Sequence, residues 1–499
     1  MDWPRAVAAD FRQAEIDFDA LSRHSKPGPR YTSYPTANEF KPSFDSKDLA
    51  SRLFDSNATG LPLSLYVHLP FCKSACYFCA CNVIYTGKDE VKARYLQFLQ
   101  KELDLLSRFF DSPAALDSGS FASALESKSL SSPTEGASSP TGASRPVVQI
   151  HFGGGTPTFF GPEQLGRVFS LLKGVFPNID PSCEISCEID PRHFHEEQMA
   201  VLRENGCNRV SFGIQDFNSD VQRAVNRIQS VDLVEKSVSI ARKHGITSIN
   251  FDLIYGLPHQ SVNSFLATLK EVVSLDPDRL AVFNYAHVPW VKKTMRKIDE
   301  TKLPAPSNKL LILKETIAFL VSHGYCMIGM DHFAKPNDAL YLYQQAGQLR
   351  RNFQGYTTKG FSQTVGIGVT SISEGLDFYS QNHKDLKSYE AALDSGLLPV
   401  ACGVVLDSED RLRKEVIMSL MNNFMLDFSA ISKAFNIDFS SHFERELEAL
   451  ALLEGQGLLS MDSSCLRVSP TGRLLIRNVA MVFDSYLVRN QSRQFSNTI

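Results

Sequence analysis

Short apolar runs alternate with longer amphipathic segments between residues 64 and 285. The apolar runs have the composition of buried strands, and they lie at 64–71, 147–152, 184–189, 208–214, 248–254 and 279–285. The intervening segments carry apolar side chains at helical spacing, and they lie at 88–110, 163–175, 195–205, 231–244 and 264–275. Regular alternation of this kind favours parallel strands joined by crossover helices. The sequence therefore predicts an α/β fold built on a partial TIM-type (β/α)6 barrel.

Polar or glycine-rich residues lie at the end of most of these predicted strands. They are the glycine run 153–158, Glu188, Gln215 with Asp216, Asp252, and the segment 284–287. In barrels of parallel strands, reactive groups gather at the carboxyl ends of the strands. We therefore expect one site at this end. Glu188 and Asp252 sit in mainly apolar strands, where an unpaired carboxylate is costly to bury, so each is either a salt-bridge partner or a ligand-binding group.

Four cysteines lie within ten positions directly after the first predicted strand. Cys72, Cys76 and Cys79 have CxxxCxxC spacing, and Cys81 follows two positions later. Disulfides are disfavoured because nothing in the chain indicates secretion. Zinc remains an alternative, although its structural sites usually take paired ligand sets and no second CxxC or HxxxH is present. Inert core cysteines are a further alternative. The spacing favours an iron–sulfur cluster bound by three thiolates, with one iron left open for a reacting ligand.

Composition argues against several classes of protein. The net charge of −4 over 499 residues, without a long basic tract, argues against nucleic-acid binding. No run of about 18 apolar residues predicts a membrane span. The amino-terminal residues lack the apolar core of a signal peptide and the acid-poor character of a transit peptide. We expect a cytoplasmic protein; a transit peptide removed before this start would instead place it in an organelle.

The remaining segments predict three regions. Residues 1–45 form an amino-terminal extension, with a short amphipathic helix in 1–23 and a Pro, Gly and Tyr-rich linker in 26–40. Residues 46–353 form the barrel, interrupted at 112–145 by a disordered insertion with eleven serines. Residues 354–499 form a mainly helical, winged-helix-like domain that covers the substrate. Its expected elements are helices at 409–424 and 441–453, a short strand at 466–468 and one closing helix at 470–486.

The cysteine stretch resembles the cluster loop of the radical S-adenosylmethionine superfamily, in which CxxxCxxC follows a strand and an aromatic residue precedes the third cysteine. The longer match, YVHLPFC through CACN, together with GPRYTSYPTA, GYCMIGMDHFAKPND and TGRLLIRNVAMVFDSYL, resembles the oxygen-independent coproporphyrinogen III oxidases. The resemblance implies a [4Fe–4S] cluster on Cys72, Cys76 and Cys79, with Cys81 not a ligand. It also implies two molecules of S-adenosylmethionine, one of them cleaved at the open iron to a 5′-deoxyadenosyl radical.

The resemblance also implies which residues contact S-adenosylmethionine. Gly154, Gly155 and Thr156 match the superfamily's glycine motif, which meets the amino-acid end of the cofactor. The other matching positions are Glu188, Gln215, Arg227, Asp252, Tyr66, Phe78, Ala286 and Ile372. By composition alone Arg227 belongs to a solvated helix face, and Tyr66 and Phe78 to the core. His68 has the same simple interpretation, as a hydrogen-bonded core histidine.

The function implied by the resemblance is the conversion of two propionates of coproporphyrinogen III to vinyl groups, with release of carbon dioxide, giving protoporphyrinogen IX. Such an oxidoreductase serves haem biosynthesis and needs an electron donor and an acceptor that the sequence does not identify. Arg30 and Arg192 are candidates for binding substrate carboxylates, and Cys81 for a role on the substrate side. We expect a monomer. The alternative is a haem-binding chaperone of the same superfamily, whose HNxxYW motif has only QNHKDLKSY (381–389) as a counterpart here.

Overall fold

The computed structural model describes residues 16–110 and 145–489. The predicted serine-rich insertion therefore lies almost wholly outside the described residues, as does most of the helix predicted within residues 1–23. Within the described ranges, no helix has both the length and the apolar character needed to cross a bilayer.

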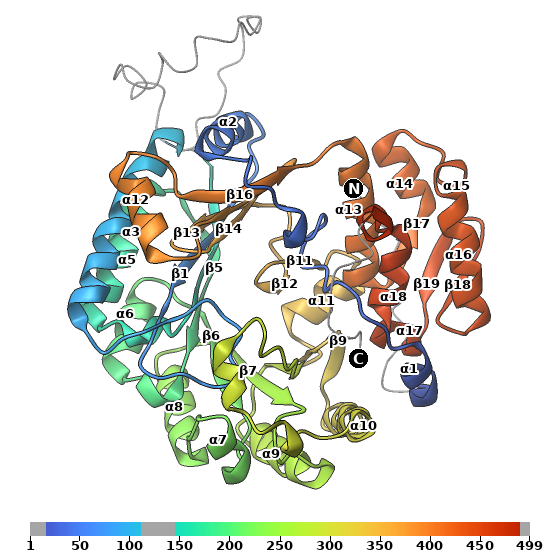
Figure 1. The fold of residues 1–499 in the computed structure, drawn as a ribbon, viewed down its shortest axis with the longest axis horizontal. Coiled ribbons are helices and arrows are strands. Elements are labelled where there is room, and N and C mark those ends of the chain that lie inside the picture. Colours follow the sequence, from blue (N-terminus) through green and yellow to red (C-terminus); the bar gives the residue numbers. More distant parts are fainter. Residues whose placement is uncertain (1–15, 111–144, 490–499) are drawn as a thin grey trace, which may run out of the picture.

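A curved sheet of twelve strands forms the body of the molecule (Figure 1). Its centre holds six parallel strands in chain order, each paired with the next. They are β1 (Leu63–Leu69), β4 (Val147–Gly154), β5 (Ile179–Ile189), β6 (Arg209–Gln215), β7 (Ser248–Tyr255) and β8 (Arg279–Asn284). The predicted six-strand partial barrel is confirmed. Strand ends agree with the sequence within about two residues, except that β5 begins five residues earlier.

The sheet extends beyond the six predicted strands at both edges. Antiparallel strands β10 (His332–Ala334) and β9 (Cys326–Gly329) follow β8. At the other edge β13 pairs in parallel with β1, and three antiparallel strands follow it. These four are β13 (Gln363–Ile367), β14 (Ile372–Glu374), β15 (Phe378–Asn382) and β16 (Val400–Val405). Strands β13–β16 follow the domain boundary predicted after residue 353, yet they belong to the barrel sheet. The reason is that β13 pairs with β1, which lies about 300 positions earlier in the chain.

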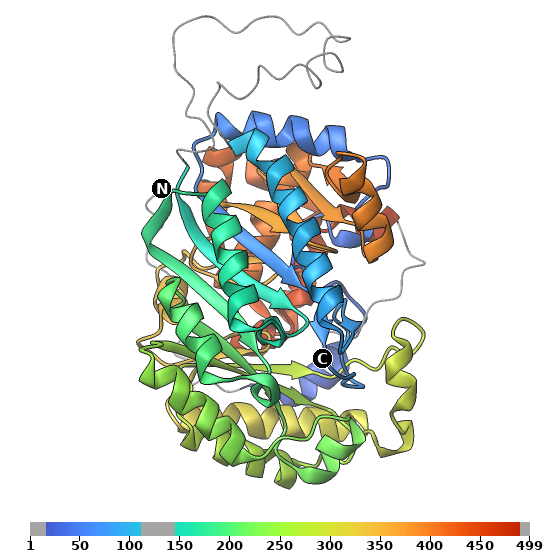
Figure 2. The same cartoon turned by 90° about the vertical axis from the view of Figure 1, so that its left-hand side faces the viewer.

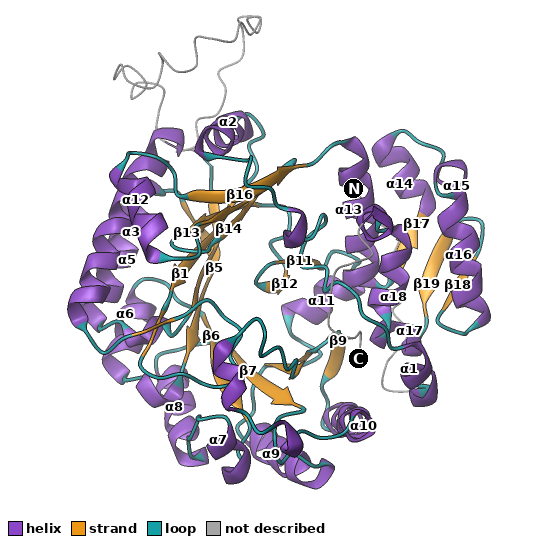
Figure 3. Cartoon of the chain, viewed as in Figure 1, coloured by secondary structure: helices purple, strands orange, loops and turns teal. Residues whose placement is uncertain are grey.

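Helices cover the outer, convex face of the sheet (Figures 2 and 3). They are α3 (Asp89–Phe110), α5 (Pro162–Val175), α6 (Glu196–Glu204), α7 (Ser219–Ala224), α8 (Val231–Lys243), α9 (Val262–Ser274) and α10 (Pro306–Ser322). Each of the five helices predicted between the barrel strands is present within two residues of its expected ends, whereas the helix predicted over 441–453 is divided at Phe443. In α3, for example, Tyr95, Leu99 and Leu103 form one buried stripe. Side-chain caps fix several starts, as where Ser230 accepts from the Leu233 N–H.

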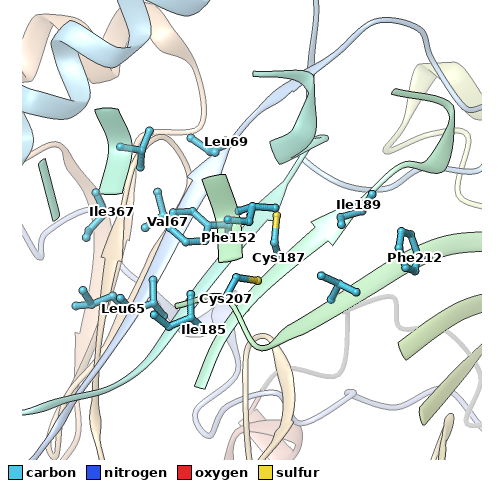
Figure 4. Packing of buried hydrophobic residues seen from close by; sticks show 14 of the residues in the cluster. Leu65, Val67, Leu69, Phe152, Ile185, Cys187, Ile189, Cys207, Phe212 and Ile367 are labelled. Carbon is cyan, nitrogen blue, oxygen red and sulfur yellow. The ribbon is translucent and has the colours of Figure 1, made fainter. Parts of the chain in front are cut away.

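The barrel core lies between the strands and these helices (Figure 4). Leu65, Val67 and Leu69 of β1 are fully buried there, beside Phe152 and Ile185 of the neighbouring strands. Because side chains alternate across a strand, the residues between them face the opposite, concave side. On β1 those are Ser64, Tyr66 and His68, which are polar. The strands therefore place an apolar face against the helices and a polar face around the barrel interior.

The carboxyl-terminal region forms a second, mainly helical core. Its elements are α13 (Ser408–Asn423), α14 (Phe428–Phe435), α15 (Phe439–His442), α16 (Glu444–Gly455) and the antiparallel strands β17 (Met425–Asp427), β18 (Leu459–Met461) and β19 (Cys465–Val468). The single closing helix expected over 470–486 is wrong. The segment is divided into α17 (Pro470–Leu474), α18 (Ile476–Ala480), the short 3-10 turn Met481–Phe483 and α19 (Ser485–Arg489).

The break has a packing cause. Leu475 is the hinge between α17 and α18, and it is fully buried. Gly472 packs so tightly that an added Cβ would overlap the Leu458 carbonyl oxygen. After the turn, Asp484 leaves helical geometry and accepts a hydrogen bond of 2.9 Å from the Tyr31 hydroxyl. Tertiary contacts on all sides thus override the local helical pattern.

The amino-terminal extension runs across this second core. It contains α1 (Phe18–His24), a 3-10 turn at Ala37–Glu39 and α2 (Ser46–Asn57). Helix α1 contacts α10 of the barrel and α17 of the carboxyl-terminal region (Figure 1). The stretch predicted as a linker is anchored rather than free: the Arg477 guanidinium donates to the carbonyls of Pro29 and Gly28, and the hydroxyls of Tyr34 and Ser485 are hydrogen-bonded.

Several short elements connect the larger ones. They are β2 (Phe71–Cys72), β3 (Ile84–Tyr85), β11 (Arg350–Asn352), β12 (Gly355–Thr357), α11 (Ala339–Gln345), α12 (Leu386–Asp394) and the 3-10 turns Pro157–Phe159, Pro191–His193, Lys293–Lys297 and Glu300–Lys302. Of these, β2 and β3 matter for function because they bracket the cysteine loop.

Candidate active site

The cysteine loop opens onto a cavity of about 350 Å³ at the carboxyl ends of the parallel strands, which we call the inner cavity. Cys72, Cys76, Cys79 and Cys81 all line it. The loop is fixed at its base, where β2 pairs with β3 and the Ile84 N–H donates to the Pro70 carbonyl at 2.8 Å. The apolar strand β1 thus delivers all four thiols to one wall of the barrel interior.

The glycine run packs against this loop. Gly155 donates its N–H to the Leu69 carbonyl and Thr156 to the Phe71 carbonyl, both at 2.9 Å. Gly154 has φ +113°, and an added Cβ would lie 2.6 Å from the His68 ring. At Gly155 a Cβ would lie 2.6 Å from the Pro70 backbone. Both glycines line the inner cavity, yet what requires glycine here is close packing against the cysteine loop.

A buried charge group surrounds Cys76. The Asp190 carboxylate accepts from Arg192 at 2.7 Å and from Arg227 at 3.1 Å. Each guanidinium also donates to the Cys76 sulfur, at 3.4 Å and 3.5 Å. Burial raises the pKa of Asp190, but the Arg227 and Arg192 charges outweigh it and hold that pKa well below its usual range. The Cys76 sulfur therefore lies against two guanidinium groups that are themselves held by one carboxylate.

The positions of Arg227 and Arg192 can now be compared with what the sequence predicted for them. Arg227 is buried, so the solvated helix face that composition suggested for it is wrong. Arg192, a candidate for binding substrate carboxylates, donates to Asp190 and Cys76, so its guanidinium lies beside the cysteine loop. Asp190, which organises both, was not predicted from the sequence. The sequence could have indicated Asp190, because this residue directly follows β5 and precedes a turn that begins with Pro191.

Glu188 and Asp252 face the inner cavity without a lysine or arginine partner in the part of the chain that the structure describes. Glu188 contacts His151 Nε2 at 3.2 Å and accepts from the Gly154 N–H at 3.2 Å. Its pKa is lowered, because these interactions exceed the opposing effect of burial. Asp252 accepts from Ser211 and Asn250. Burial, and then the nearby Glu188 charge, raise the pKa of Asp252 to about 6. A structural salt bridge to lysine or arginine is thus not supported for either carboxylate.

Tyr66 and His68 lie just behind the cavity wall. The Tyr66 hydroxyl is 3.0 Å from His68 Nδ1, and His68 Nε2 is 3.0 Å from the Asn82 carbonyl. The Tyr66 ring stacks on His151 with centroids 5.9 Å apart. His68 is buried, and burial lowers its pKa. It is therefore a hydrogen-bonded core histidine, as its simple interpretation predicted, and it ties β1 to the end of the cysteine loop.

The structure brings most of the predicted cofactor-binding residues together. Those lining the inner cavity are Phe78, Gly154, Gly155, Thr156, Glu188, Gln215, Arg227 and Asp252. Three do not line it: Tyr66 stacks behind His151, Ile372 lies in β14 against Gly366, and Ala286 lines a second cavity. Arg30 lines that second cavity as well and forms an ion pair of 3.4 Å with Asp331.

Sequence reasoning missed a set of polar residues deeper in the barrel. They lie on the concave face and include Arg209, Asn250, Arg279 and His332. Arg209 pairs with Glu184 at 3.1 Å and Arg279 with Asp338 at 2.7 Å. Burial and neighbouring guanidiniums lower the pKa of His332 to about 3. Part of this set could have been found in β6 and β7, where polar residues recur at every second position, at Arg209 and Ser211 and at Asn250 and Asp252.

The thiols suit a cluster by their chemistry and placement. Cys72, Cys76 and Cys79 share one loop and one cavity, and thiolates are the usual ligands of iron–sulfur clusters. Among residues 16–110 and 145–489, no three His, Cys, Asp or Glu side chains are gathered closely enough to hold a single metal ion. Burial raises the pKa of Cys72 to about 12, so metal binding there must displace a proton.

Comparison with known proteins first defines the class. The radical SAM superfamily model matches residues 138–272, and the HemN C-terminal domain model matches residues 406–475. The first match covers β4 to α9, and the second covers most of the helical carboxyl-terminal region. Together with the three-cysteine loop at the mouth of a partial barrel, these matches define a radical SAM enzyme.

Full-length relatives define the family within this class. The chain is 55% identical to the oxygen-independent coproporphyrinogen III oxidase of Helicobacter pylori strain J99, over 97% of this chain and 99% of that protein. It is 42% identical to the enzyme of that name from Escherichia coli K12, over 98% and 99%. The solved structure titled "Coproporphyrinogen III oxidase (HemN) from Escherichia coli is a Radical SAM enzyme" aligns with TM-score 0.85 and 42% identity, covering 95% and 100%. The chain belongs to the oxygen-independent coproporphyrinogen III oxidases, and the chaperone alternative is not supported.

Proposed function

We propose that this enzyme converts coproporphyrinogen III to protoporphyrinogen IX without oxygen, as a step of haem biosynthesis. Two propionate side chains become vinyl groups, and each loses a hydrogen atom, carbon dioxide and one electron. The observation that carries the proposal is the placement of the family's motif residues: the three cysteines and eight of the predicted contact positions line one cavity. The electron leaves to an acceptor, and a separate donor reduces the cluster; both stay unidentified partners.

The inner cavity supplies what such chemistry demands of a protein. When bound, a [4Fe–4S] cluster and S-adenosylmethionine provide a one-electron route to remove an unactivated hydrogen, which no side-chain base can do. Cys72, Cys76 and Cys79 would hold the cluster. Arg192 and Arg227 place positive charge beside Cys76. Glu188 and Asp252 present carboxylate oxygens that can accept from the amino and hydroxyl groups of S-adenosylmethionine.

Three finer expectations remain predictions. The first is that each chain binds two molecules of S-adenosylmethionine, and equilibrium dialysis of the reconstituted enzyme measures this number directly. A monomer is the second, which light scattering tests. The cytoplasm is the third, which fractionation of the source cells tests.

An anaerobic assay tests the proposal as a whole. Reconstituted enzyme is mixed with a reductant, S-adenosylmethionine, coproporphyrinogen III and a cell extract that supplies the acceptor, and products are measured by mass spectrometry. We expect protoporphyrinogen IX together with 5′-deoxyadenosine. Deoxyadenosine without decarboxylation would retain the radical chemistry and refute the substrate. Neither product, with haem bound tightly instead, would favour the chaperone.

A further inference from the structure

A second and larger cavity, of about 750 Å³, lies beside the inner one; we call it the outer cavity. It sits at the carboxyl ends of β7 and β8, between α10 and the segments that carry α1, Arg30 and Arg477. Aromatic and apolar side chains line much of it, namely Tyr255, Tyr285, Val288, Trp290, Val291, Leu310 and Leu313. Trp290 and Val291 are 65% and 64% exposed, which is unusual for large apolar side chains in a folded protein.

Among the described residues that line the outer cavity, three are cations, Arg30, Lys309 and Arg477, and one is a carboxylate, Asp331. Arg477 donates to the carbonyls of Gly28 and Pro29. Asp331 is engaged by Arg30 at 3.4 Å. Lys309 donates to the Tyr285 carbonyl at 3.0 Å and has no carboxylate partner in the described ranges. A half-buried cation without a counter-ion is costly, and an anionic ligand would relieve that cost.

The fold makes specific room for Lys309. Gly256 follows β7 with φ +88°, and an added Cβ would lie 2.7 Å from Lys309 Cε. Any other residue at 256 would therefore meet both a strained backbone and the stem of this lysine. The ammonium group is thus directed past Gly256 to the cavity wall, instead of lying on the open face of α10.

The two cavities share a wall. Phe283 lines the inner cavity, and the next two residues of the same strand end, Asn284 and Tyr285, line the outer one. The β9–β10 hairpin does the same, with His332 on the inner side and Asp331 on the outer side. A third connection is the loop that carries Trp290, because its Lys292 ammonium donates to the Cys81 carbonyl at 2.9 Å. A ligand in the outer cavity therefore lies next to the cysteine loop.

From these observations we propose that the outer cavity binds the tetrapyrrole ring of the substrate, with one propionate carboxylate on Lys309. This inference rests on the proposed function. The pyrrole faces pack on Trp290 and Tyr285, and the reacting propionate extends across the shared wall toward Cys81. Size supports the assignment, because the volume of the outer cavity, about 750 Å³, is within the range of pockets that hold larger ligands. Charge supports it as well, since the substrate carries four carboxylates.

A binding titration tests the role of Lys309 without turnover. Trp3 and Trp290 are the two tryptophans of the chain, so a Trp3→Phe background leaves Trp290 as the reporter. Coproporphyrin III, the stable oxidised form, is added under anaerobic conditions and the Trp290 emission followed. We expect Lys309→Gln to weaken binding about tenfold or more, since a charged hydrogen bond is lost. Lys270→Gln, the same change at an exposed lysine of α9 that lines neither cavity, should bind like the parent protein.

Two further measurements guard against a folding artefact. Lys309→Arg keeps the charge and should bind within a few-fold of the parent. The tetramethyl ester of coproporphyrin, which lacks the carboxylates, should bind the parent protein weakly and should not distinguish it from Lys309→Gln.

The outcomes separate this inference from the proposed function. Equal coproporphyrin affinity in Lys309→Gln and parent, or equal affinity for acid and ester, would each overturn the assignment while turnover persists. A parent protein that neither binds coproporphyrin nor forms protoporphyrinogen would instead refute the proposed function itself.

Discussion

The inner and outer cavities are built on opposite principles. In the inner cavity most charges are matched within the protein: Asp190 serves two arginines, Glu184 pairs with Arg209 and Asp338 with Arg279. In the outer cavity aromatic and apolar side chains line much of the wall, and Lys309 has no carboxylate partner within residues 16–110 and 145–489. Matched charges fix side chains in place, as suits a small cofactor that must react at a defined position. An unmatched cation in a wide apolar cavity leaves the counter-charge to the ligand.

The largest effect is expected where the inner cavity would hold metal. Replacing Cys72, Cys76 or Cys79 by serine removes one of three thiolates, so cluster assembly and cleavage of S-adenosylmethionine should both be lost. Visible absorbance after reconstitution and deoxyadenosine formation are the measurements. Cys402→Ser, at a part-buried thiol outside both cavities, is the matched control. Cys81→Ser should keep the cluster and lower product formation; loss of the cluster there would make Cys81 a fourth ligand.

The next effect concerns the matched charges themselves. Asp190→Asn leaves two buried guanidiniums without their shared carboxylate, which should lower the free energy of unfolding by about 3 to 5 kcal/mol. Urea unfolding of the metal-free protein measures it. The control is Asp220→Asn, which removes an exposed ion pair with Arg223 and should cost at most about 1 kcal/mol. Similar losses in the two variants would show that the charge group around Cys76 is not a special feature of the inner cavity.

A pH effect should appear in the inner cavity alone. The pKa of Asp252 is raised to about 6, so this carboxylate becomes protonated as the pH falls from 7 to 5 and loses its ability to accept through both oxygens. Glu188, whose pKa is lowered, stays ionised over this range. We expect the affinity for S-adenosylmethionine to fall up to about tenfold between pH 7 and pH 5.

Calorimetry of the holoenzyme measures this affinity, with absorbance confirming that the cluster persists. Asp252→Asn should bind S-adenosylmethionine more weakly at pH 7 and with little dependence on pH. An unchanged pH profile in that variant would remove Asp252 from the binding site. The comparison is coproporphyrin binding at pH 7, which should be the same in the parent protein and in Asp252→Asn.

The smallest effect is expected at the aromatic wall of the outer cavity. Trp290→Ala removes one ring face, worth about 0.5 to 1.5 kcal/mol, so coproporphyrin affinity should fall roughly two- to tenfold. Trp290→Phe should lose less, because a ring remains. Fluorescence anisotropy of the porphyrin itself measures both, since the tryptophan reporter is gone. Unchanged coproporphyrin affinity in Trp290→Ala would remove Trp290 from the proposed site of the tetrapyrrole ring.

Much of the barrel and part of the site were accessible from the sequence. The six parallel strands and their helices were found because buried strands and amphipathic helices carry different apolar periods. Glu188 and Asp252, the carboxylates that line the inner cavity, were found because a charge within an apolar strand is conspicuous. Asp190 was not found, although it directly follows a strand, because its partner Arg227 lies 37 positions away in the sequence. Lys309 was not found because nothing in the neighbouring sequence shows that it lies beside Gly256.

The chain by itself therefore determined the local elements, the cysteine spacing and the family, since these depend on residues close together in the sequence. Only the tertiary structure decided the rest. It placed β13–β16 in the barrel sheet and broke the closing helix, because strand pairing and all-round packing outweigh local preference. It also paired the charged side chains of the inner cavity, and it left Lys309 without a carboxylate partner among the described residues. The physical reason is that ion pairs and cavities are properties of segments far apart along the chain, which meet only when the protein is folded.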